Sequence, residues 1–388
     1  MIQAARRLDS VQEYYFATKL REVRNLMNSG KPIINAGIGN PDLLPPDHVL
    51  PALAAALQEL KAHGYQSYLG LPELRNAMAS FYHKQYQVAL NSESEIIPLM
   101  GSKEGILHIS MAFLNPGDQV LIPDPGYPTY ASATNLCEAI PVTYDLTASN
   151  NWLIDFEALE KLDLSKVKIM WTNYPHMPTG AAGSMDVFER LIAFARKHQI
   201  LLVNDNPYSC VGYENKISIH QVAGSKEVAL ELNSISKTYN MAGWRVGMLT
   251  GKAEVLKEVL KVKTNMDSGM FYGVQKGAIA ALETNNNWLE SQNNIYKNRR
   301  NLIVELAKTL GLQPQEQAGG LFVWCKLPEG QHNDKVFVDQ LLYEKNIFIA
   351  PGSVFGKNGA GYVRFSLCVN EEQIKEMIER VSNNKVEA

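Results

Sequence analysis

The residues best suited to chemistry lie in one short segment, 234–247. Lys237 is flanked there by small hydroxyl residues, with Ser234 three residues before it and Arg245 eight residues after it. Because an apolar run precedes the segment, we expect Lys237 to be partly enclosed. Partial desolvation lowers a lysine pKa and makes the neutral, nucleophilic amine accessible. The segment therefore predicts an amine that can form an imine, beside a hydroxyl and a guanidinium that can bind phosphate.

Two other loops carry polar groups directly after apolar runs. Gly101, Ser102 and Lys103 precede a predicted helix, which brings backbone amides, a hydroxyl and the positive end of a helix dipole to a point suited to a phosphate. Asp205 and Tyr208 place a carboxylate and a phenol three residues apart. Ligands of open α/β sheets bind beyond the carboxyl ends of the strands, so chemistry is expected in these loops.

The elements that must position these loops repeat one theme between residues 96 and 251. A short apolar or β-branched run leads into a turn rich in Gly, Pro, Asp or Asn and then into a helical stretch, which is typical of a parallel sheet wrapped by helices. Phe188–His198 has the apolar spacing of a crossover helix. The expected strands are Ile96–Met100, Gln119–Ile122, Val167–Thr172, Ile200–Asn204, Val228–Leu232 and Val246–Thr250.

The rest of the chain predicts a second, smaller α+β lobe. The expected elements are an N-terminal helix, a long polar helical stretch and two short strands, at Tyr14–Leu26, Gln275–Lys308, Leu321–Lys326 and Tyr362–Leu367. The predicted fold class is α/β, with a mostly parallel sheet wrapped by helices in a large domain, residues 48–280. The N-terminal arm, residues 1–47, is expected to join residues 281–388 in the small domain.

Composition narrows the class of protein. The chain has 37 Lys and Arg residues against 40 Asp and Glu, a net charge of −3, and no basic block that would mark a DNA or RNA partner. Its four cysteines form no C-x-x-C pair, which argues against a zinc site, and we expect them to be buried in a reducing compartment. We find no signal-peptide core or apolar run of membrane-spanning length. We therefore expect a cytoplasmic protein with small-molecule substrates and without metal, nucleic-acid or membrane partners.

Taken together, these motifs resemble those of the class I and II aminotransferases, pyridoxal phosphate (PLP) enzymes of fold type I, over nearly the whole chain. The SISKTYNMAGWRVG stretch around Lys237 looks like that family's lysine signature, and DPGYPTY is similar to the loop whose first tyrosine stacks on the pyridine ring. The resemblance implies PLP held as an imine on Lys237. The implied contacts are Ser102, Lys103, Ser234 and Arg245 to the phosphate, Tyr127 to the ring face, Asp205 to the ring nitrogen and Tyr208 to the ring hydroxyl. An ionised carboxylate at the ring nitrogen keeps the pyridine protonated, so that it can accept the carbanion electrons.

Three further matches concern the substrate and a partner chain. GYVRFSL looks like the strand whose arginine, here Arg364, binds the substrate α-carboxylate, a two-pronged task suited to arginine. GIGNPD is similar to the turn whose backbone, here at Ile38 and Gly39, approaches the same carboxylate. The segment that begins at Tyr65 resembles one that lends a tyrosine to the phosphate of the neighbouring subunit. The resemblance thus implies a homodimer with shared active sites.

Met177 departs from the family's pattern. Where the family usually has Asn-Pro-Thr-Gly, this chain has Met-Pro-Thr-Gly. The family's asparagine donates a hydrogen bond to the ring hydroxyl oxygen, and the loss of such a bond is worth about 1.5–3 kcal/mol if nothing replaces it. Tyr208 would remain as a donor, and His176 could swing in.

The resemblance implies transamination between an L-amino acid and a 2-oxo acid by a ping-pong mechanism, with Lys237 as imine lysine and proton shuttle in amino-acid biosynthesis or metabolism. Two alternatives stay open: a PLP-dependent C–S β-lyase on the same fold, and a PLP-binding protein with a regulatory, non-catalytic role. The amino acid is not identified. We find no unmistakable second arginine for a distal carboxylate, and the resemblance places Tyr15, Phe16, Met266 and Phe271 near the pocket.

Overall fold

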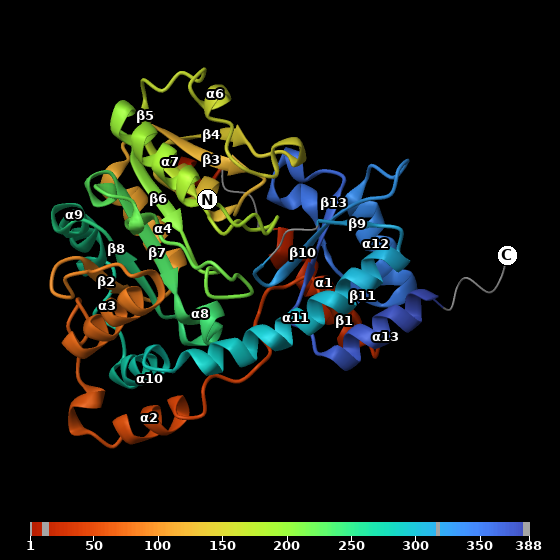
Figure 1. Cartoon of the computed structure of the whole chain (residues 1–388), viewed down its shortest axis with the longest axis horizontal. Coiled ribbons are helices and arrows are strands. Elements are labelled where there is room, and N and C mark those ends of the chain that lie inside the picture. The colour runs from red at the N-terminus through yellow and green to blue at the C-terminus, as the bar shows by residue number, and fades with distance from the viewer. Residues whose placement is uncertain (1, 10–14, 316–318, 383–388) are drawn as a thin grey trace.

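A computed structural model of the chain describes residues 2–9, 15–315 and 319–382 (Figure 1). It contains a large lobe built on a seven-stranded sheet and a smaller lobe built on a four-stranded one. The long helix α11 (Asn286–Thr309) runs from one lobe to the other.

The large sheet has the strand order β2-β8-β7-β6-β5-β3-β4. Every neighbouring pair from β7 to β4 is parallel, and β8 alone runs antiparallel to both of its neighbours in this sheet of the described residues. The predicted mostly parallel α/β fold is thus confirmed. The strands are β2 (Ile96–Leu99), β3 (Gln119–Asp124), β4 (Ile140–Asp145), β5 (Val167–Thr172), β6 (Leu201–Asp205), β7 (Ala229–Ser234) and β8 (Gly247–Thr250).

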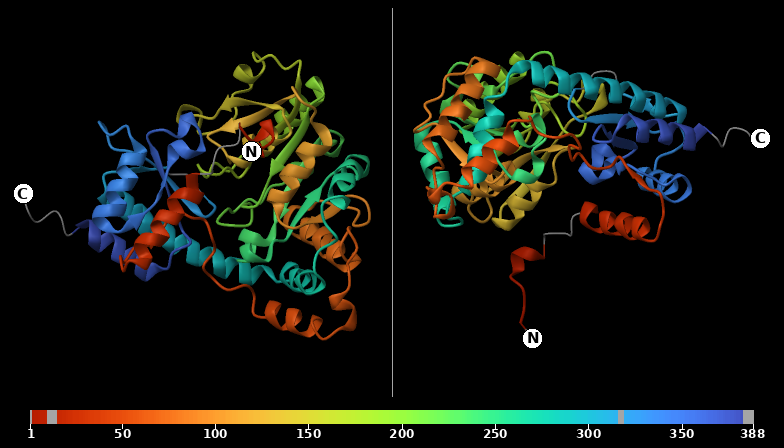
Figure 2. Two further views of the ribbon diagram at one scale, coloured as in Figure 1. Left: turned by 180° about the vertical axis from the view of Figure 1, so that it is seen from behind. Right: turned by 90° about the horizontal axis from the view of Figure 1, so that it is seen from below.

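Helices cover both faces of this sheet (Figures 1 and 2). Helix α7 (Met185–His198) shows why the sequence forms them: Ser184 caps its N-terminus by accepting from the Val187 amide, and its apolar positions recur at helical spacing and are buried. The other helices are α2 (Val49–Ala56), α3 (Pro72–Tyr86), α4 (Ser102–Phe113), α5 (Thr129–Leu136), α6 (Phe156–Leu159), α8 (Ile235–Thr238), α9 (Ala253–Thr264) and α10 (Tyr272–Leu282).

In the small lobe, the central strand pair is β10 (Phe322–Lys326) and β13 (Tyr362–Ser366), which run antiparallel. The short strands β9 (Gln313–Pro314) and β12 (Ala350–Pro351) flank this pair, whereas β11 (Ile347–Phe348) pairs with the N-terminal arm. Two helices, α12 (Asp334–Lys345) and α13 (Glu371–Ser382), pack on the lobe. Single 3₁₀ turns lie at Arg6–Leu8, Leu60–His63, Ala148–Asn150, Ile219–Gln221, Ser225–Glu227, Ala242–Trp244, Gly352–Phe355 and Lys357–Gly359.

Residues 15–35 of the N-terminal arm lie against the small lobe (Figure 2), whereas its first turn, Arg6–Leu8, contacts α5 of the large lobe. Strand β1 (Ile34–Asn35) pairs in parallel with β11, and Lys19 of helix α1 (Tyr15–Asn28) forms an ion pair of 2.7 Å with Asp339 of α12. The first residue of the predicted helix, Tyr14, lies outside the described residues. The domain bounds predicted from the sequence stay predictions.

Several sequence expectations need correction. Strand β4 was not predicted, because it forms the edge of the sheet and most of its residues are not buried. The stretch predicted as one helix from Gln275 is divided between α10 and α11, and Asn285 caps α11 by accepting from the Trp288 amide. Cys210 and Cys325 are buried as expected, whereas Cys137 and Cys368 are half-buried.

Candidate active site

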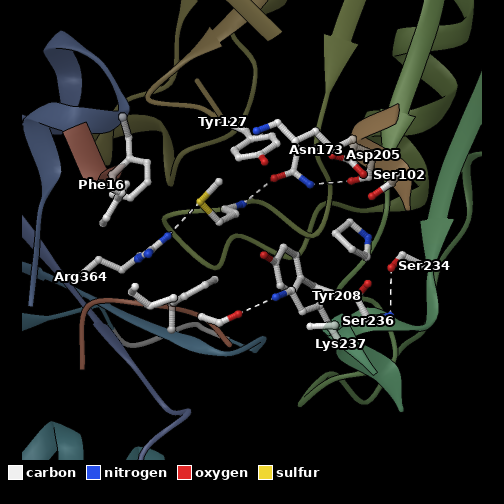
Figure 3. Close-up of a pocket in the computed structure, with 18 of the residues that line it drawn as sticks. Phe16, Ser102, Tyr127, Asn173, Asp205, Tyr208, Ser234, Ser236, Lys237 and Arg364 are labelled. Atoms are coloured by element: carbon white, nitrogen blue, oxygen red, sulfur yellow. Dashed lines mark hydrogen bonds between the residues drawn. The ribbon is translucent and has the colours of Figure 1, made fainter. Parts of the chain in front are cut away.

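The predicted site residues meet in one cavity at the carboxyl ends of the large-sheet strands, where the small lobe and the N-terminal arm close over them (Figure 3). The predicted residues that line it are Ile38, Gly39, Ser102, Lys103, Tyr127, Asp205, Tyr208, Ser234, Lys237, Arg245 and Arg364. Tyr65 does not line this cavity and is 94% exposed. Of the four residues placed near the pocket, Phe16 lines the cavity, whereas Tyr15, Met266 and Phe271 do not.

Gly247 brings the first group of these residues together. It pairs with Leu99 of β2 on one side and with Ser234 of β7 on the other. A Cβ atom at this position would lie 2.7 Å from the Ser102 backbone nitrogen, so only glycine permits the approach. The start of α4, Ser234 and the loop that carries Arg245 therefore converge.

The converging groups form an anion cradle. Gly101 adopts φ +88°, and a side chain there would overlap the Arg245 guanidinium. The N-terminal amides of α4 begin at Ser102, and Ser234 caps α8 by accepting from the Ser236 amide at 2.9 Å. A guanidinium, serine hydroxyls and the N-terminus of a twelve-residue helix together suit a phosphate.

Lys237 lies in the single turn α8, directly beyond the cradle. Its side chain is partly buried, and its Nζ donates a hydrogen bond to the Gly39 carbonyl of the N-terminal arm. Burial lowers the lysine pKa, and the nearby Arg364 and Arg245 guanidiniums lower it further against an opposing effect of Cys368. Both effects shift the equilibrium toward the neutral amine that a nucleophile requires.

Asp205 is the last residue of β6 and points into the same cavity. Tyr130 donates to its Oδ2 at 2.9 Å, while its Oδ1 is buried and has no hydrogen-bond partner among the described residues. Burial raises the Asp205 pKa to about 7, and the charge of buried Glu231 adds to the rise. A buried acceptor without a donor fits a ligand that brings its own N–H or positive charge.

Tyr130 was missed by the sequence analysis. It is the second residue of the short helix α5, three residues after Tyr127, and its ring stacks on Trp171 with centroids 5.0 Å apart. Its role depends on contacts between distant segments. The spacing from Tyr127 is the only local signal.

The loop after β5 holds Met177 in the cavity next to Arg364, whose Nη1 lies 3.2 Å from the Met177 sulfur. Asn173, also missed from the sequence, lines the cavity and accepts from the Met177 amide at 2.8 Å. His176 does not replace the missing donor. Its Nε2 donates to the Pro125 carbonyl at 3.1 Å, so its Nδ1 accepts from the Thr179 hydroxyl at 2.8 Å. Burial lowers the His176 pKa to about 3.

Arg364 is buried among aromatic rings on β13. Its guanidinium carbon lies 3.9 Å from the centroid of Phe322, 4.6 Å from that of Phe355 and 5.9 Å from that of Phe16. Its Nη2 donates to the Gly37 carbonyl at 2.9 Å. The rings hold the guanidinium plane at the cavity wall, opposite Lys237 (Figure 3). Phe322 and Phe355 were not predicted, because nothing in their own segments distinguishes them from core residues.

An anion cradle, an enclosed amine, a buried carboxylate and a fixed guanidinium define a PLP site with a place for a carboxylate substrate. Residues 31–381 match the model of the family described as aminotransferase class I and II. The chain belongs to this family, and it is a PLP-dependent aminotransferase. This confirms the resemblance, the cofactor and the leading function, and it favours transamination over both alternatives.

Individual relatives match this chain over nearly its full length. The chain is 37% identical to the LL-diaminopimelate aminotransferase of Dehalococcoides mccartyi and 38% identical to that of Aquifex aeolicus, with 100% of each chain covered. The substrate-bound BacF structure from Bacillus subtilis is 34% identical, with a TM-score of 0.95 over 99% of this chain and 98% of that one. Within the described residues, no helix is long and apolar enough to cross a membrane.

Proposed function

We propose that Lys237 is the residue that bonds PLP and then carries the proton during transamination between an L-amino acid and a 2-oxo acid. One observation carries the proposal: the Lys237 amine lies in the cavity that the anion cradle, Asp205 and Arg364 also line. No other lysine of the described residues lines this cavity except Lys103, at the start of α4.

The residues present fit the cofactor. Ser102, Lys103, Ser234 and Arg245 would hold the phosphate, Tyr127 would cover one face of the ring, and Asp205 Oδ1 would accept from the ring nitrogen. When bound, PLP supplies an electrophilic carbon and a ring that accepts the electrons of the breaking Cα–H bond.

Lys237 acts twice in this proposal. Its lowered pKa gives an amine that can bond the cofactor, and the same amine, once released by a substrate, can take the Cα proton and deliver it to the PLP carbon that Lys237 had bonded. The partly buried setting excludes bulk water from this transfer. Tyr208, three residues after Asp205, would donate to the ring hydroxyl oxygen, and burial raises its pKa, so that the phenol keeps its proton.

Arg364 would orient the substrate. The planar guanidinium offers two parallel N–H groups to an α-carboxylate, and its aromatic surroundings fix the plane. Ile38 and Gly39 of the N-terminal turn line the cavity on the same side and would approach the carboxylate with their backbone.

We infer a homodimer in which Tyr65 reaches the phosphate of the partner. Large apolar side chains are exposed around this tyrosine: Leu60 is 95% exposed, and Met266 and Phe271 lie in a loop that contacts residues 66 and 67. Such exposed apolar clusters mark protein interfaces.

A cytoplasmic location also stays a proposal. The two curated relatives are named for LL-diaminopimelate.

Borohydride reduction tests the role of Lys237. The reduced, PLP-loaded protein should carry its label on the peptide that contains Lys237, and Lys237→Ala should lose the label and all measurable turnover. Lys103→Ala is the matched control, because it removes the other lysine of the cavity and should keep the covalent label. A label on any other lysine would refute the assignment.

A further inference from the structure

The charged groups of the cavity are all used by the proposed reaction. The charged residues that line it are Lys103, Asp205, Lys237, Arg245 and Arg364. In the proposed function, on which this inference rests, they serve the phosphate, the ring nitrogen, the covalent bond and the α-carboxylate. No charged side chain of the described cavity is therefore left for a second charged end of a substrate.

The wall beyond Arg364 is apolar. Phe16 and Leu20, one turn apart on α1, line the cavity. The centroid of the Phe16 ring lies 6.0 Å from the centroid of the Phe355 ring. Ile38 completes this wall from the N-terminal turn. Figure 3 shows Phe16 beside Arg364, on the side away from Asp205. A substrate held by its carboxylate on Arg364 would place its side chain near these groups.

Two charged residues of α1, Lys19 and Glu22, have their partners outside this wall. Lys19 forms ion pairs with Glu22 at 2.9 Å and with Asp339 of α12 at 2.7 Å, and Glu22 also accepts from the Tyr343 hydroxyl. These pairs fix the helix so that Phe16 and Leu20 face the cavity. A charged substrate end placed against them would lose its water without gaining a partner from the described residues of this chain.

We propose that the amino-acid substrate has an apolar, aromatic side chain that packs on Phe16, Leu20, Ile38 and Phe355. LL-diaminopimelate carries a second amino and a second carboxyl group at its far end, and it is therefore a poor substrate of this site. The inference names the substrate class of the proposed transamination.

Half-reactions test the proposal without an assumption about the 2-oxo acid. PLP-loaded enzyme is mixed separately with L-phenylalanine, LL-diaminopimelate and L-alanine, and the loss of the cofactor's absorbance band is followed by stopped flow. L-Phenylalanine should react with a second-order rate constant at least about tenfold above that of LL-diaminopimelate, the range that apolar pocket contacts provide.

Variants locate the selectivity. Phe16→Ala and Leu20→Ala should each lower the ratio of the phenylalanine to the alanine rate constant by about tenfold. Met27→Ala is the matched control on the same helix, because Met27 is 48% exposed, and it should keep the ratio. A PLP titration of each variant checks that the protein is folded and loaded.

The outcomes separate the two proposals. If LL-diaminopimelate reacts as fast as L-phenylalanine, the substrate class is wrong while transamination stands. If phenylalanine is preferred but both α1 variants keep the ratio, the assigned wall is wrong. If no amino acid discharges the absorbance band, the proposed function itself fails.

Discussion

Met177 replaces a hydrogen-bond donor with a sulfur atom that contacts Arg364 at 3.2 Å. Both nitrogens of His176 are occupied by Thr179 and Pro125, so His176 supplies no substitute. An asparagine amide at position 177 would stabilise the negative ring oxygen that accompanies loss of the proton from the bond between PLP and Lys237. The pKa of the nitrogen that joins PLP to Lys237 should therefore be higher in the wild type than in Met177→Asn.

A spectral pH titration of the two loaded proteins checks this sign. The wild type should change from its protonated to its unprotonated band at the higher pH. Coincident midpoints would mean that an ordered water already makes the bond, and a lower midpoint for the wild type would show that the loop is misinterpreted.

Asp205 makes the stability of the PLP-free protein depend on pH. Burial raises its pKa from an ordinary value near 3.8 to about 7, so between these values the folded chain binds more protons than the unfolded chain. The free energy of unfolding should therefore fall as pH rises from about 4 to 7, by up to about 4 kcal/mol. Asp205→Asn should lack this loss. Denaturant unfolding of both proteins at pH 5 and pH 7.5 gives the change in the free energy of unfolding between these two pH values. An equal change in the wild type and in Asp205→Asn would contradict the prediction.

At the scale of elements, the cradle depends on glycine at position 101. Gly101 has φ +88° and faces the Arg245 guanidinium, whereas Gly117 has φ +86° and nothing within 4 Å of an added Cβ. Both positions have a positive φ that disfavours alanine, but an added Cβ meets other atoms only at Gly101. Gly101→Ala should weaken PLP binding at least about tenfold by displacing Arg245, a loss of the size of one charge-assisted contact.

Gly117→Ala is the control, because it also places alanine at a positive φ but brings the added Cβ into contact with nothing. It should lower stability by about 1 kcal/mol and leave PLP affinity unchanged. Equal PLP affinities in the two alanine variants, measured by fluorescence titration, would show that displacement of Arg245 does not weaken PLP binding.

The sequence predicts the elements that carry strong patterns. Strand β5 was predicted with both ends correct, because it is apolar and sits in the centre of the sheet. Strands β6 and β7 were predicted to end before Asp205 and Ser234, yet these polar residues are the last of each strand. A polar residue at a strand end looks like a loop residue in the sequence, although it keeps its ladder bonds.

The site was predicted where local motifs carry it and missed where distant segments meet. Lys237 and Asp205 follow apolar runs in recognisable loops. Tyr130 and Phe322 act through partners far along the chain, Asp205 and Arg364 respectively. Such pairings depend on the strand order and on lobe packing, which a single sequence does not display.

At the scale of the whole molecule, activity should require two chains. Tyr65→Phe and Lys237→Ala proteins, each poor alone, should regain activity when they are mixed and exchange subunits, because one site of the hybrid combines an intact Lys237 with an intact Tyr65. Steady-state turnover after exchange is the measurement.

The control is a mixture of Tyr65→Phe with the double variant Tyr65→Phe/Lys237→Ala, in which no site is complete. Equal turnover of the two mixtures, with exchange demonstrated by mass spectrometry, would rule out a shared site.

The turn from Gly37 to Gly39 has a consequence for how affinities at this site should be understood. Its carbonyls accept from Arg364 at one end and from Lys237 at the other, two basic side chains that belong to different lobes. The Arg364 guanidinium is therefore already hydrogen-bonded before its ligand arrives. Binding of a substrate carboxylate to Arg364 is then an exchange of acceptors, in which the new contact is worth the net value of a hydrogen bond to a charged group, about 1.5–3 kcal/mol, and not the gross value of about 4–6 kcal/mol. The protein thereby keeps its binding groups in place while holding its substrates weakly enough to release them.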